Sequence, residues 1–484
     1  MAELEIALPE GVGSVDEYAA ALRRAYTQYG YLPRMGIVDF FVERLWEQLP
    51  SEWRAYFGDG AFDIGSLIPL AAAGQLGPGA PESLQAYVGD MFRLRLAGGH
   101  AAEGDGSAGA LRHFLDGMSP KKQVEVAALS RVVDEAAAAT GSGLVVDVGA
   151  GQGYLSRVLA YGPTRSQPRV LAVDSRIKQG AERLQRRTVK RLGGQQARRD
   201  GVEWDSARAS RLQHAIMRVD MDSGAELREM AHGAAPGEPW MLCGLHACGD
   251  LSSAVLRVFA ESDARAVVVV PCCYNHISEP PAGRGFPMSR AMDGVVLGRN
   301  VLKTACQATA RWDASPEATT DTFRRNYFRA VLHQLMVAHG QLAADTVPAV
   351  GRVTRSELAA AQAECGPADG ATADERAFTV YARAALGKLG LAWRPTAAQC
   401  VECCRQAGGG LGLGQIAAVW ALRSLAGPVI EAMLVVDRAL FLAAHCEAGS
   451  RVQAYALFDA ATSPRNVVLV AQRPAAAAIV AGHA

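Results

Sequence analysis

Apolar runs alternate with amphipathic stretches through the middle of the chain. The runs span residues 144–148, 170–174, 215–219, 240–245 and 266–270. Near-continuous apolar composition is typical of strands that are buried on both faces. The alternation of such runs with helical patterns predicts an α/β fold, in which helices cover both faces of a parallel sheet.

Two further apolar runs, 452–458 and 467–471, lie near the end of the chain and flank a polar turn that contains Ser463 and Pro464. This pattern predicts an adjacent pair of strands. We expect the pair to complete the same sheet, which then has seven strands. The helical material from about residue 290 to 425 is then an insertion within the fold.

Apolar residues recur at helical spacing from residue 14 to 57, which predicts a helical lobe near the start of the chain. Segments rich in Gly and Ala, 72–80 and 98–109, indicate loops around a helix near 81–96. We therefore expect four parts: a helical lobe at 1–115, a core at 116–290, a helical insertion at 291–425, and the end of the core at 426–484.

A glycine-rich turn follows the first predicted strand. The sequence Leu144-Val-Val-Asp-Val-Gly-Ala-Gly-Gln-Gly153 places Asp147 before Gly149, Gly151 and Gly153. Glycine lets the backbone adopt conformations that a Cβ would forbid, so the chain can approach a ligand closely. The spacing differs from the G-x-G-x-x-G dinucleotide fingerprint. An acidic turn also suits a cationic cofactor better than it suits an anionic pyrophosphate, which prefers free amides at a helix N-terminus. The turn therefore predicts S-adenosylmethionine rather than NAD.

Two acids follow the next two strands. Asp174 ends the second strand, where its carboxylate oxygens can accept both ribose hydroxyls of the cofactor; the alternative is a cap on the helix that begins near Ser175. Asp220 follows the third strand and can accept from the adenine amino group, while Met221 packs on the ring. We assign Asp147, the three glycines, Asp174, Asp220 and Met221 to cofactor binding.

Two polar loops follow the fourth and fifth strands and face the same crevice. His246 can orient the methyl acceptor or take its proton near neutral pH. Asp250 can orient the acceptor or cap the helix from Leu251. Tyr274 offers a stacking face and Asn275 an amide, which together can hold a base, although Tyr274 can equally be a core residue.

Cysteine and histidine side chains also gather in these loops, and thiolates and imidazoles are zinc ligands. The chain has no paired C-x-x-C knuckles, so we predict no metal. Cys272 remains a candidate nucleophile that could add to a pyrimidine ring during methyl transfer. The residues concerned are Cys243, His246, Cys248, Cys272, Cys273 and His276.

Charge is balanced over the 484 residues, with 49 Lys and Arg against 49 Asp and Glu, so no global field favours nucleic acid. A local basic helix runs from Arg176 to Arg191 and contains the single acid Glu182. Such a face beside a cofactor crevice can track a phosphate backbone, which makes RNA the predicted partner; a solvated surface is the alternative.

Lys121 and Lys122 begin a helix that Ser119 and Pro120 predict. Cations in a first turn oppose the helix dipole, so the two lysines either guide an RNA phosphate or are solvated surface residues.

Composition and cysteine usage bear on the compartment. Half of the residues are hydrophobic and 20% are charged, which is typical of globular proteins. The ten cysteines are irregularly placed, and the chain begins without a basic region followed by an apolar run, so we expect reduced thiols in the cytoplasm or nucleus. Polar residues interrupt the longest apolar stretches, and we expect no membrane association.

Several spaced motifs together resemble the methyltransferase-like protein 25 family, which includes proteins named for a ribosomal-RNA adenine dimethylase-like domain. The resemblance implies a Rossmann-like class I methyltransferase fold and S-adenosylmethionine as cofactor. The histidine-cysteine and double-cysteine loops also resemble a transfer-RNA 2′-O-methyltransferase family. The motifs are Met118-Ser-Pro-Lys-Lys122, the glycine turn, Gly244-Leu-His-Ala-Cys-Gly-Asp-Leu251, Cys272-Cys-Tyr274, Gly285-Phe-Pro-Met-Ser289 and Ser463-Pro-Arg-Asn466.

These patterns favour an S-adenosylmethionine-dependent methyltransferase that acts on RNA, with His246, Asp250, Tyr274 and Asn275 on the acceptor side. The alternatives are a cysteine-dependent pyrimidine C5-methyltransferase, a protein methyltransferase, and a non-catalytic module that binds the cofactor and uses its helical lobes to contact a protein partner. The chain lacks the Asn/Asp-Pro-Pro-Tyr/Phe motif of adenine amino-methyltransferases, so the acceptor atom stays open.

Overall fold

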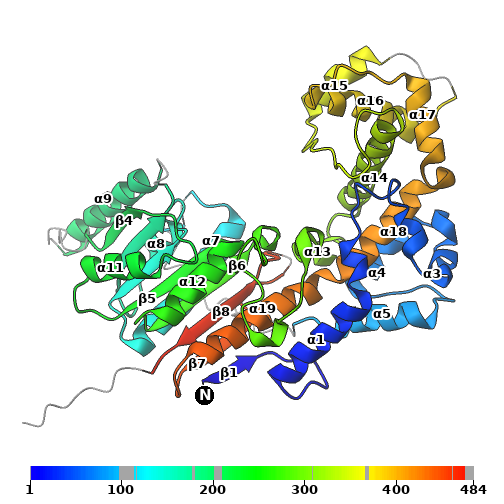
Figure 1. Cartoon of the computed structure of the whole chain (residues 1–484). Helices are drawn as coiled ribbons and strands as arrows, with labels where there is room; N and C mark the ends of the chain where they lie inside the picture. Colours follow the sequence, from blue (N-terminus) through cyan, green and yellow to red (C-terminus); the bar gives the residue numbers. More distant parts are fainter. Residues whose placement is uncertain are drawn as a thin grey trace, which may run out of the picture. The chain divides into compact units, whose positions relative to one another are not determined.

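A computed structural model describes residues 2–96, 114–115, 117–176, 180–200, 210–307, 309–365, 370–460 and 462–474. The chain forms two compact units (Figure 1). Unit 1 comprises residues 1–26, 94–306 and 428–484, and unit 2 comprises 27–93 and 307–427. Within the described ranges, no helix combines the length and apolar character needed to cross a membrane.

Unit 1 is built on a mixed sheet of eight strands in the order β1-β7-β8-β6-β5-β2-β3-β4. All neighbouring strands are parallel except for β8, which runs antiparallel to β6 and β7. The late pair therefore completes the sheet, as predicted. The strands are β1 (Glu3–Ile6), β2 (Leu144–Val148), β3 (Arg169–Asp174), β4 (Leu212–Ile216), β5 (Trp240–Cys248), β6 (Ala266–Cys272), β7 (Arg451–Ala456) and β8 (Val467–Gln472).

The prediction of seven strands was wrong because it omitted β1. This strand has only four residues, and its alternation of Glu with Leu and Ile is too short to stand out in the sequence. It pairs in parallel with β7 at the edge of the sheet, where Glu5 forms an ion pair with Arg451 at 2.8 Å. Pairing with a strand some 450 residues away carries no local sequence signal.

The third predicted strand was misplaced by three residues. The run 215–219 was expected, whereas β4 spans Leu212–Ile216. β4 is the opposite edge of the sheet, so its interior tolerates Gln213 and His214, and Ile216 is 65% exposed. An edge strand with one neighbour does not need the continuous apolar run that marks a buried strand.

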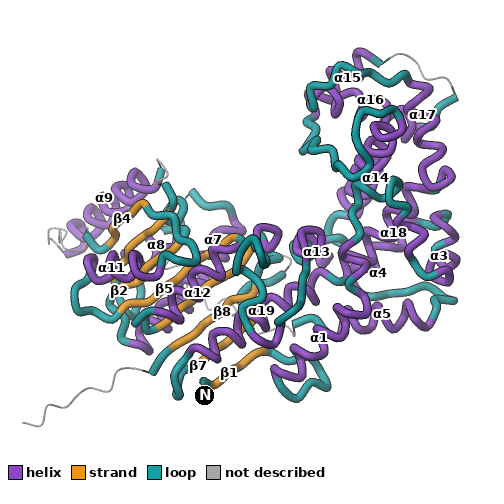
Figure 2. The backbone as a smooth tube through the Cα atoms, in the orientation of Figure 1, coloured by secondary structure: helices purple, strands orange, loops and turns teal. Residues whose placement is uncertain are grey.

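Helices cover both faces of the sheet, as the orange strands between purple helices in Figure 2 show. Val145 and Val268 face α7 and α8, whereas Val146 and Val269 face α11, α12 and α19. Each central strand is thus buried on both sides, which explains its apolar run. The helices of unit 1 are α1 (Val15–Tyr29, ending in unit 2), α7 (Pro120–Thr140), α8 (Tyr154–Tyr161), α9 (Ala181–Asp200), α11 (Gly224–Ala234), α12 (Asp250–Glu261), α13 (Gly298–Thr304) and α19 (Gly427–His445).

Unit 2 is helical and draws on two distant segments of the chain. Tyr87 donates to the carbonyl of Leu422 at 2.6 Å, and Arg423 donates to the carbonyl of Met35 at 2.7 Å. Most of the expected N-terminal lobe and most of the expected insertion therefore pack as one body. The helices are α2 (Tyr31–Arg34), α3 (Ser51–Tyr56), α4 (Leu67–Ala73), α5 (Glu82–Arg93), α14 (Pro316–Ala338), α15 (Arg355–Glu364), α16 (Ala373–Lys388), α17 (Ala397–Gln406) and α18 (Gly412–Leu425).

Candidate functional site

The glycine turn leaves the carboxyl end of β2 and leads into α8. Gly149, Gly151 and Gly153 have φ values of +75°, +59° and +68°. Side chains with a Cβ rarely adopt this left-handed region. At Gly149 an added Cβ would also lie 3.1 Å from Leu251 Cδ2. The three glycines are therefore required by the path of the backbone.

Asp174, at the end of β3, lies against this turn. Its Oδ2 accepts from the amide of Gly151 at 2.9 Å, and its Oδ1 accepts from the amide of Arg176 at 3.3 Å. Ser175 and Arg176 are not helical, and α9 begins at Ala181. The carboxylate thus joins β3 to the glycine turn. Its predicted contact with the ribose of the cofactor stays a prediction.

Asp147 is buried within β2 and is 2% exposed. Its Oδ2 accepts from Ser156 Oγ on α8 at 2.5 Å. Burial raises the pKa of Asp147 to about 6, although the hydrogen bond from Ser156 and the charge of Lys122 oppose this rise. The side chain therefore ties the strand to the helix beneath the turn, and a contact with the cofactor stays a prediction.

Asp220 and Met221 lie beyond the end of β4. Asp220 is exposed and accepts from Ser223 Oγ at 2.8 Å and from the amide of Asp222 at 3.1 Å. These hydrogen bonds lower the pKa of Asp220. Met221 is half-buried. Both residues shape the turn before α11, and their predicted contacts with adenine are untested.

His246 lies in an irregular part of β5. The parallel register with β6 shifts between Leu245 and Ala247, and His246 has a φ of +62°. Its Nε2 lies 3.0 Å from Glu125 Oε2, and its side chain is 25% exposed. The bulge therefore turns the imidazole out of the ladder and toward α7.

Glu125 is a site residue that the sequence reasoning missed. It is 1% exposed, and its Oε1 accepts from Ser463 Oγ at 2.8 Å. The amines of Lys121 and Lys122 lie 3.5 and 3.6 Å from its oxygens. Burial opposes ionisation, but the hydrogen bonds and charges of His246, Ser463 and Lys122 hold the pKa at about 2. Glu125 is therefore ionised and orients His246.

A sequence signal for Glu125 existed. The two lysines sit three and four positions before it on one helix, and residues at this spacing share a helix face. Their opposition to the helix dipole is offset by the buried carboxylate that they contact. Burial lowers the pKa of Lys122, while Glu125 counteracts that change. The lysines thus belong to the site through Glu125, rather than as isolated surface charges.

Asp250 is the first residue of α12. Its Oδ1 accepts from the amide of Ser278 at 2.7 Å, and a Cβ at Gly285 would collide with the same oxygen. The carboxylate therefore holds the loop after β6 against the start of α12. This contact differs from the predicted helix cap, and it competes with the predicted orientation of the acceptor.

Tyr274 is 1% exposed, which does not agree with the predicted stacking on a base. Its hydroxyl donates to Glu431 Oε1 at 2.9 Å, and the Arg465 guanidinium lies 5.8 Å from the ring centroid. Burial raises its pKa. The neighbouring Asn275 is half-buried and accepts from Cys306 Sγ at 3.6 Å. The core alternative fits Tyr274, whereas the role of Asn275 stays a prediction.

Three thiols meet beside His246. Cys248 Sγ lies 3.0 Å from Cys272 Sγ and 3.4 Å from Cys273 Sγ. Cys248 is exposed and Cys272 is buried. Hydrogen bonds with Cys272 and Cys273 lower the pKa of Cys248 to about 6, whereas the contact with Cys248 and burial raise the pKa of Cys272. Cys248 is the most accessible thiol of the three, whereas Cys272, the predicted nucleophile, is buried.

The basic helix corresponds to α9, with Arg176 just before it. Lys178 lies outside the described residues, as do the side chains from Arg191 onward. The exposed cations follow one another at helical spacing, which gathers positive charge on one face. They are Arg183, Arg186, Arg187 and Lys190.

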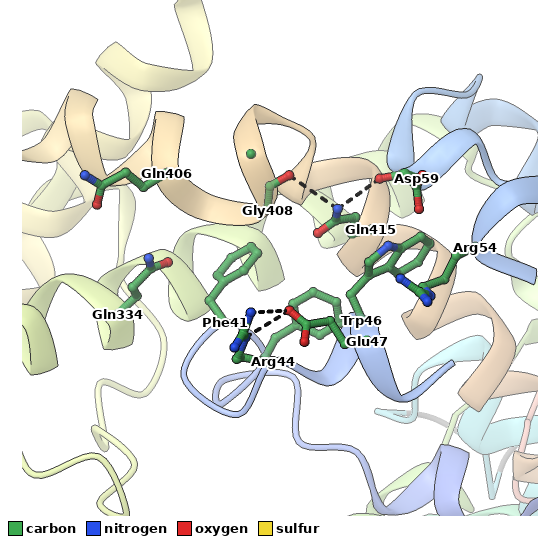
Figure 3. A pocket seen from close by; sticks show the side chains of 12 residues that line it. Phe41, Arg44, Trp46, Glu47, Arg54, Asp59, Gln334, Gln406, Gly408 and Gln415 are labelled. Carbon is green, nitrogen blue, oxygen red and sulfur yellow. Dashed lines mark hydrogen bonds and ion pairs between the residues drawn. The ribbon is translucent and has the colours of Figure 1, made fainter. Parts of the chain in front are cut away.

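A separate polar cavity of about 420 Å³ lies within unit 2 (Figure 3). Arg44 pairs with Glu47 at its wall, and Gln415 donates to the carbonyls of Asp59 and Gly408. Two other lining atoms, Arg54 Nε and Gln334 Oε1, are buried without a hydrogen-bond partner among the described residues. The residues that line this cavity are distant in the sequence from the glycine turn.

Comparison with known proteins identifies the domain around this site. Residues 121–280 match a family described as a methyltransferase domain. This segment holds all of the predicted site residues. The chain therefore contains a methyltransferase domain, and the eight-stranded α/β unit is consistent with the expected Rossmann-like class I fold.

Two curated proteins named "Probable methyltransferase-like protein 25" are similar to the chain. The Mus musculus protein is 25% identical over 251 residues, which cover 48% of this chain and 37% of that protein. The Homo sapiens protein is 32% identical over 111 residues, which cover 20% and 18%. The expected resemblance is confirmed, and the chain spans less than two fifths of the length of these relatives.

Proposed function

We propose that the protein is a methyltransferase that uses S-adenosylmethionine and acts in the cytoplasm or nucleus. The observation that carries the proposal is the glycine turn joined to Asp174 within the segment that matches a methyltransferase domain. Three left-handed glycines give the close backbone approach that a nucleoside ligand needs, and the adjacent strand-end carboxylate can accept hydroxyl donors. The residues present therefore fit this cofactor.

S-adenosylmethionine supplies an electrophilic methyl group on a sulfonium. The chain contributes mainly by positioning the reactants, which removes much of the entropic cost of bringing them together. Glu125 accepts from His246 Nε2, which leaves His246 Nδ1 as a proton acceptor. We propose that this nitrogen takes the proton that the acceptor loses, while the ionised Glu125 stabilises the resulting imidazolium.

We further propose RNA as the acceptor. The exposed cations of α9 support this choice because a row of cations can follow a phosphate backbone. A protein acceptor is the alternative that the labelling experiment below distinguishes. A pyrimidine C5 mechanism through Cys272 has less support, because the raised pKa of that thiol disfavours the thiolate that would attack.

The test is incubation of the full chain with tritium-labelled S-adenosylmethionine and separate pools of cellular RNA and protein. We expect label in RNA and a loss of about 100-fold or more in the His246→Asn variant, within the range for general-base removal. The matched control is His232→Asn, since His232 lies on α11 and pairs with Asp263. Label in protein alone would contradict RNA, and no transfer to either pool would contradict the catalytic proposal.

A further inference from the structure

The sheet brings three cysteines together at the carboxyl ends of two neighbouring strands. Cys248 and Cys272 are direct partners in the parallel register of β5 and β6, and Cys273 follows at once. The bulge at His246 sets this register, because it shifts the pairing between Leu245 and Ala247. Without the shift, Cys248 would lie opposite Cys273, so the irregularity selects Cys272 as its direct partner. Either register places Cys248 beside the two consecutive cysteines that end this strand.

The surrounding backbone is constrained in a way that favours this arrangement. Cys273 has a φ of +48°, in the left-handed region that residues other than glycine seldom adopt. Gly249 has a φ of +56°, and a Cβ there would lie 2.6 Å from the carbonyl oxygen and the Cβ of His276. Backbone strain of this kind is concentrated at functional sites.

The sulfur positions fit a metal ion better than a set of packed thiols. The three Sγ atoms are separated by 3.0, 3.4 and 3.7 Å. Thiolates that bind Zn²⁺ at about 2.3 Å in a tetrahedron lie about 3.8 Å apart, so small side-chain shifts would suffice. A disulfide needs a separation of about 2.05 Å, and it would leave one thiol unused.

We propose that Cys248, Cys272 and Cys273 bind one Zn²⁺ ion as thiolates, with the fourth coordination position open to water or an exogenous ligand. Among the residues that the structure describes, the cluster contains no fourth histidine, cysteine or carboxylate. Three protein ligands with an open position are typical of reactive rather than structural zinc sites. Binding releases the thiol protons to solvent.

This site goes beyond methyl transfer and does not depend on it. It also departs from the sequence-based expectation of no metal, which relied on the lack of paired C-x-x-C knuckles among these loops. That spacing rule applies to ligands from one local loop, whereas strand register supplies these ligands from residues 24 positions apart. Cys243 does not join the cluster, because it is buried in the core between the sheet and α7.

The test uses the full chain, reduced with a phosphine and freed of metal by dialysis against a chelator. Titration with Co²⁺ should produce an intense thiolate-to-cobalt charge-transfer band that saturates at one equivalent, and Zn²⁺ should abolish this band. Cys248→Ser should weaken Zn²⁺ binding at least 10-fold. Cys306→Ser is the matched control, since Cys306 lies nearby but bonds Asn275 and Leu302, and it should bind as the wild type does.

A measurement on the wild type guards against misfolded variants. Mass spectrometry measures the rate at which each cysteine is alkylated. Zn²⁺ should slow the alkylation of Cys248, Cys272 and Cys273 and leave the rates at Cys306 and Cys446 unchanged. The proposal is overturned if the reduced wild type binds no Co²⁺ or Zn²⁺, or if protection falls on other cysteines. Equal loss of binding in Cys306→Ser and Cys248→Ser would also overturn it.

Discussion

Individual carboxylates have opposite electrostatic environments in this domain. Asp147 is fully buried, and burial raises its pKa to about 6 because the hydrogen bond from Ser156 only partly offsets the loss of solvent. Glu125 is also buried, but it accepts hydrogen bonds from His246 and Ser463 and forms ion pairs with two lysines. Its pKa is therefore lowered to about 2. Sequence indicated that Asp147 mattered because it precedes the glycines. For Glu125 the only local signal was the pair of lysines three and four positions before it, because its other partners, His246 and Ser463, are distant in the sequence.

Asp147→Asn should change the pH dependence of stability. A carboxyl with a raised pKa in the folded state destabilises the fold once it ionises, so its cost appears as the pH rises from about 4 through 6. Between pH 4 and pH 8, the free energy of unfolding of the variant should therefore rise by about 2 kcal/mol relative to that of the wild type. Urea unfolding at both pH values measures this gain, and a constant difference between the two proteins would refute the raised pKa.

Glu125→Gln should impair methyl transfer without weakening the cofactor site. A neutral amide cannot stabilise a charged His246, so we expect transfer to fall at least 10-fold while the Kd for S-adenosylmethionine changes less than about 2-fold. Glu135→Gln is the control, because Glu135 is exposed on the same helix. Radiolabel transfer and calorimetry provide the two readouts. Unchanged transfer in Glu125→Gln would remove the proposed role of this residue.

At the scale of elements, the sequence predicted what local chemistry determines. The central strands and the glycine turn were predictable, because apolar runs and left-handed glycines are local requirements. The edge strands were not: β1 is too short, and β4 carries polar residues that a single neighbour permits. The bulge at His246 was also invisible, because it depends on the register between β5 and β6. The gathering of cysteines in the loops after β5 and β6 was predictable, whereas the direct pairing of Cys248 with Cys272 depends on this register.

Gly149→Ala should lose the cofactor beyond the cost of backbone strain. An alanine at φ +75° costs about 1 kcal/mol, and its Cβ would also press on Leu251. Gly141→Ala is matched, since Gly141 has a φ of +67° at the end of α7 and open space for a Cβ. Thermal unfolding should show similar losses of stability, whereas calorimetry should show at least 10-fold weaker S-adenosylmethionine binding only at Gly149. Equal affinities would contradict the assignment.

The exposed face of α9 should determine RNA affinity. Arg183 and Arg187 lie one helical turn apart on this face. Replacing both with Gln should reduce the magnitude of the slope of log binding constant against log salt concentration by about 1 to 2. Arg352→Gln with Arg355→Gln removes the same charge from exposed positions in unit 2. Fluorescence anisotropy with unfractionated small RNA measures both. If the two double variants bind RNA alike, α9 is a solvated surface.

At the scale of the whole molecule, each compact unit is assembled from separated segments. Sequence reasoning placed the last two strands in the core sheet, and the register of β8 with β6 agrees. It treated the helical segments as separate bodies, because periodicity reveals amphipathic faces but not which faces meet. The match to a methyltransferase domain covers residues 121–280, all within unit 1. A ligand at the glycine turn should therefore stabilise unit 1 specifically.

Calorimetric titration of S-adenosylmethionine into the full chain tests the central claim most directly. The account predicts saturable binding at one site per chain, weakened at least 10-fold by Asp174→Asn, because the amide loses one carboxylate oxygen as a hydroxyl acceptor. Asp293→Asn, at an exposed position, should bind as the wild type does. Absence of heat from the wild type at cofactor concentrations up to about 1 mM, with or without RNA, would contradict the account, since a Kd of 1 mM already corresponds to only about 4 kcal/mol.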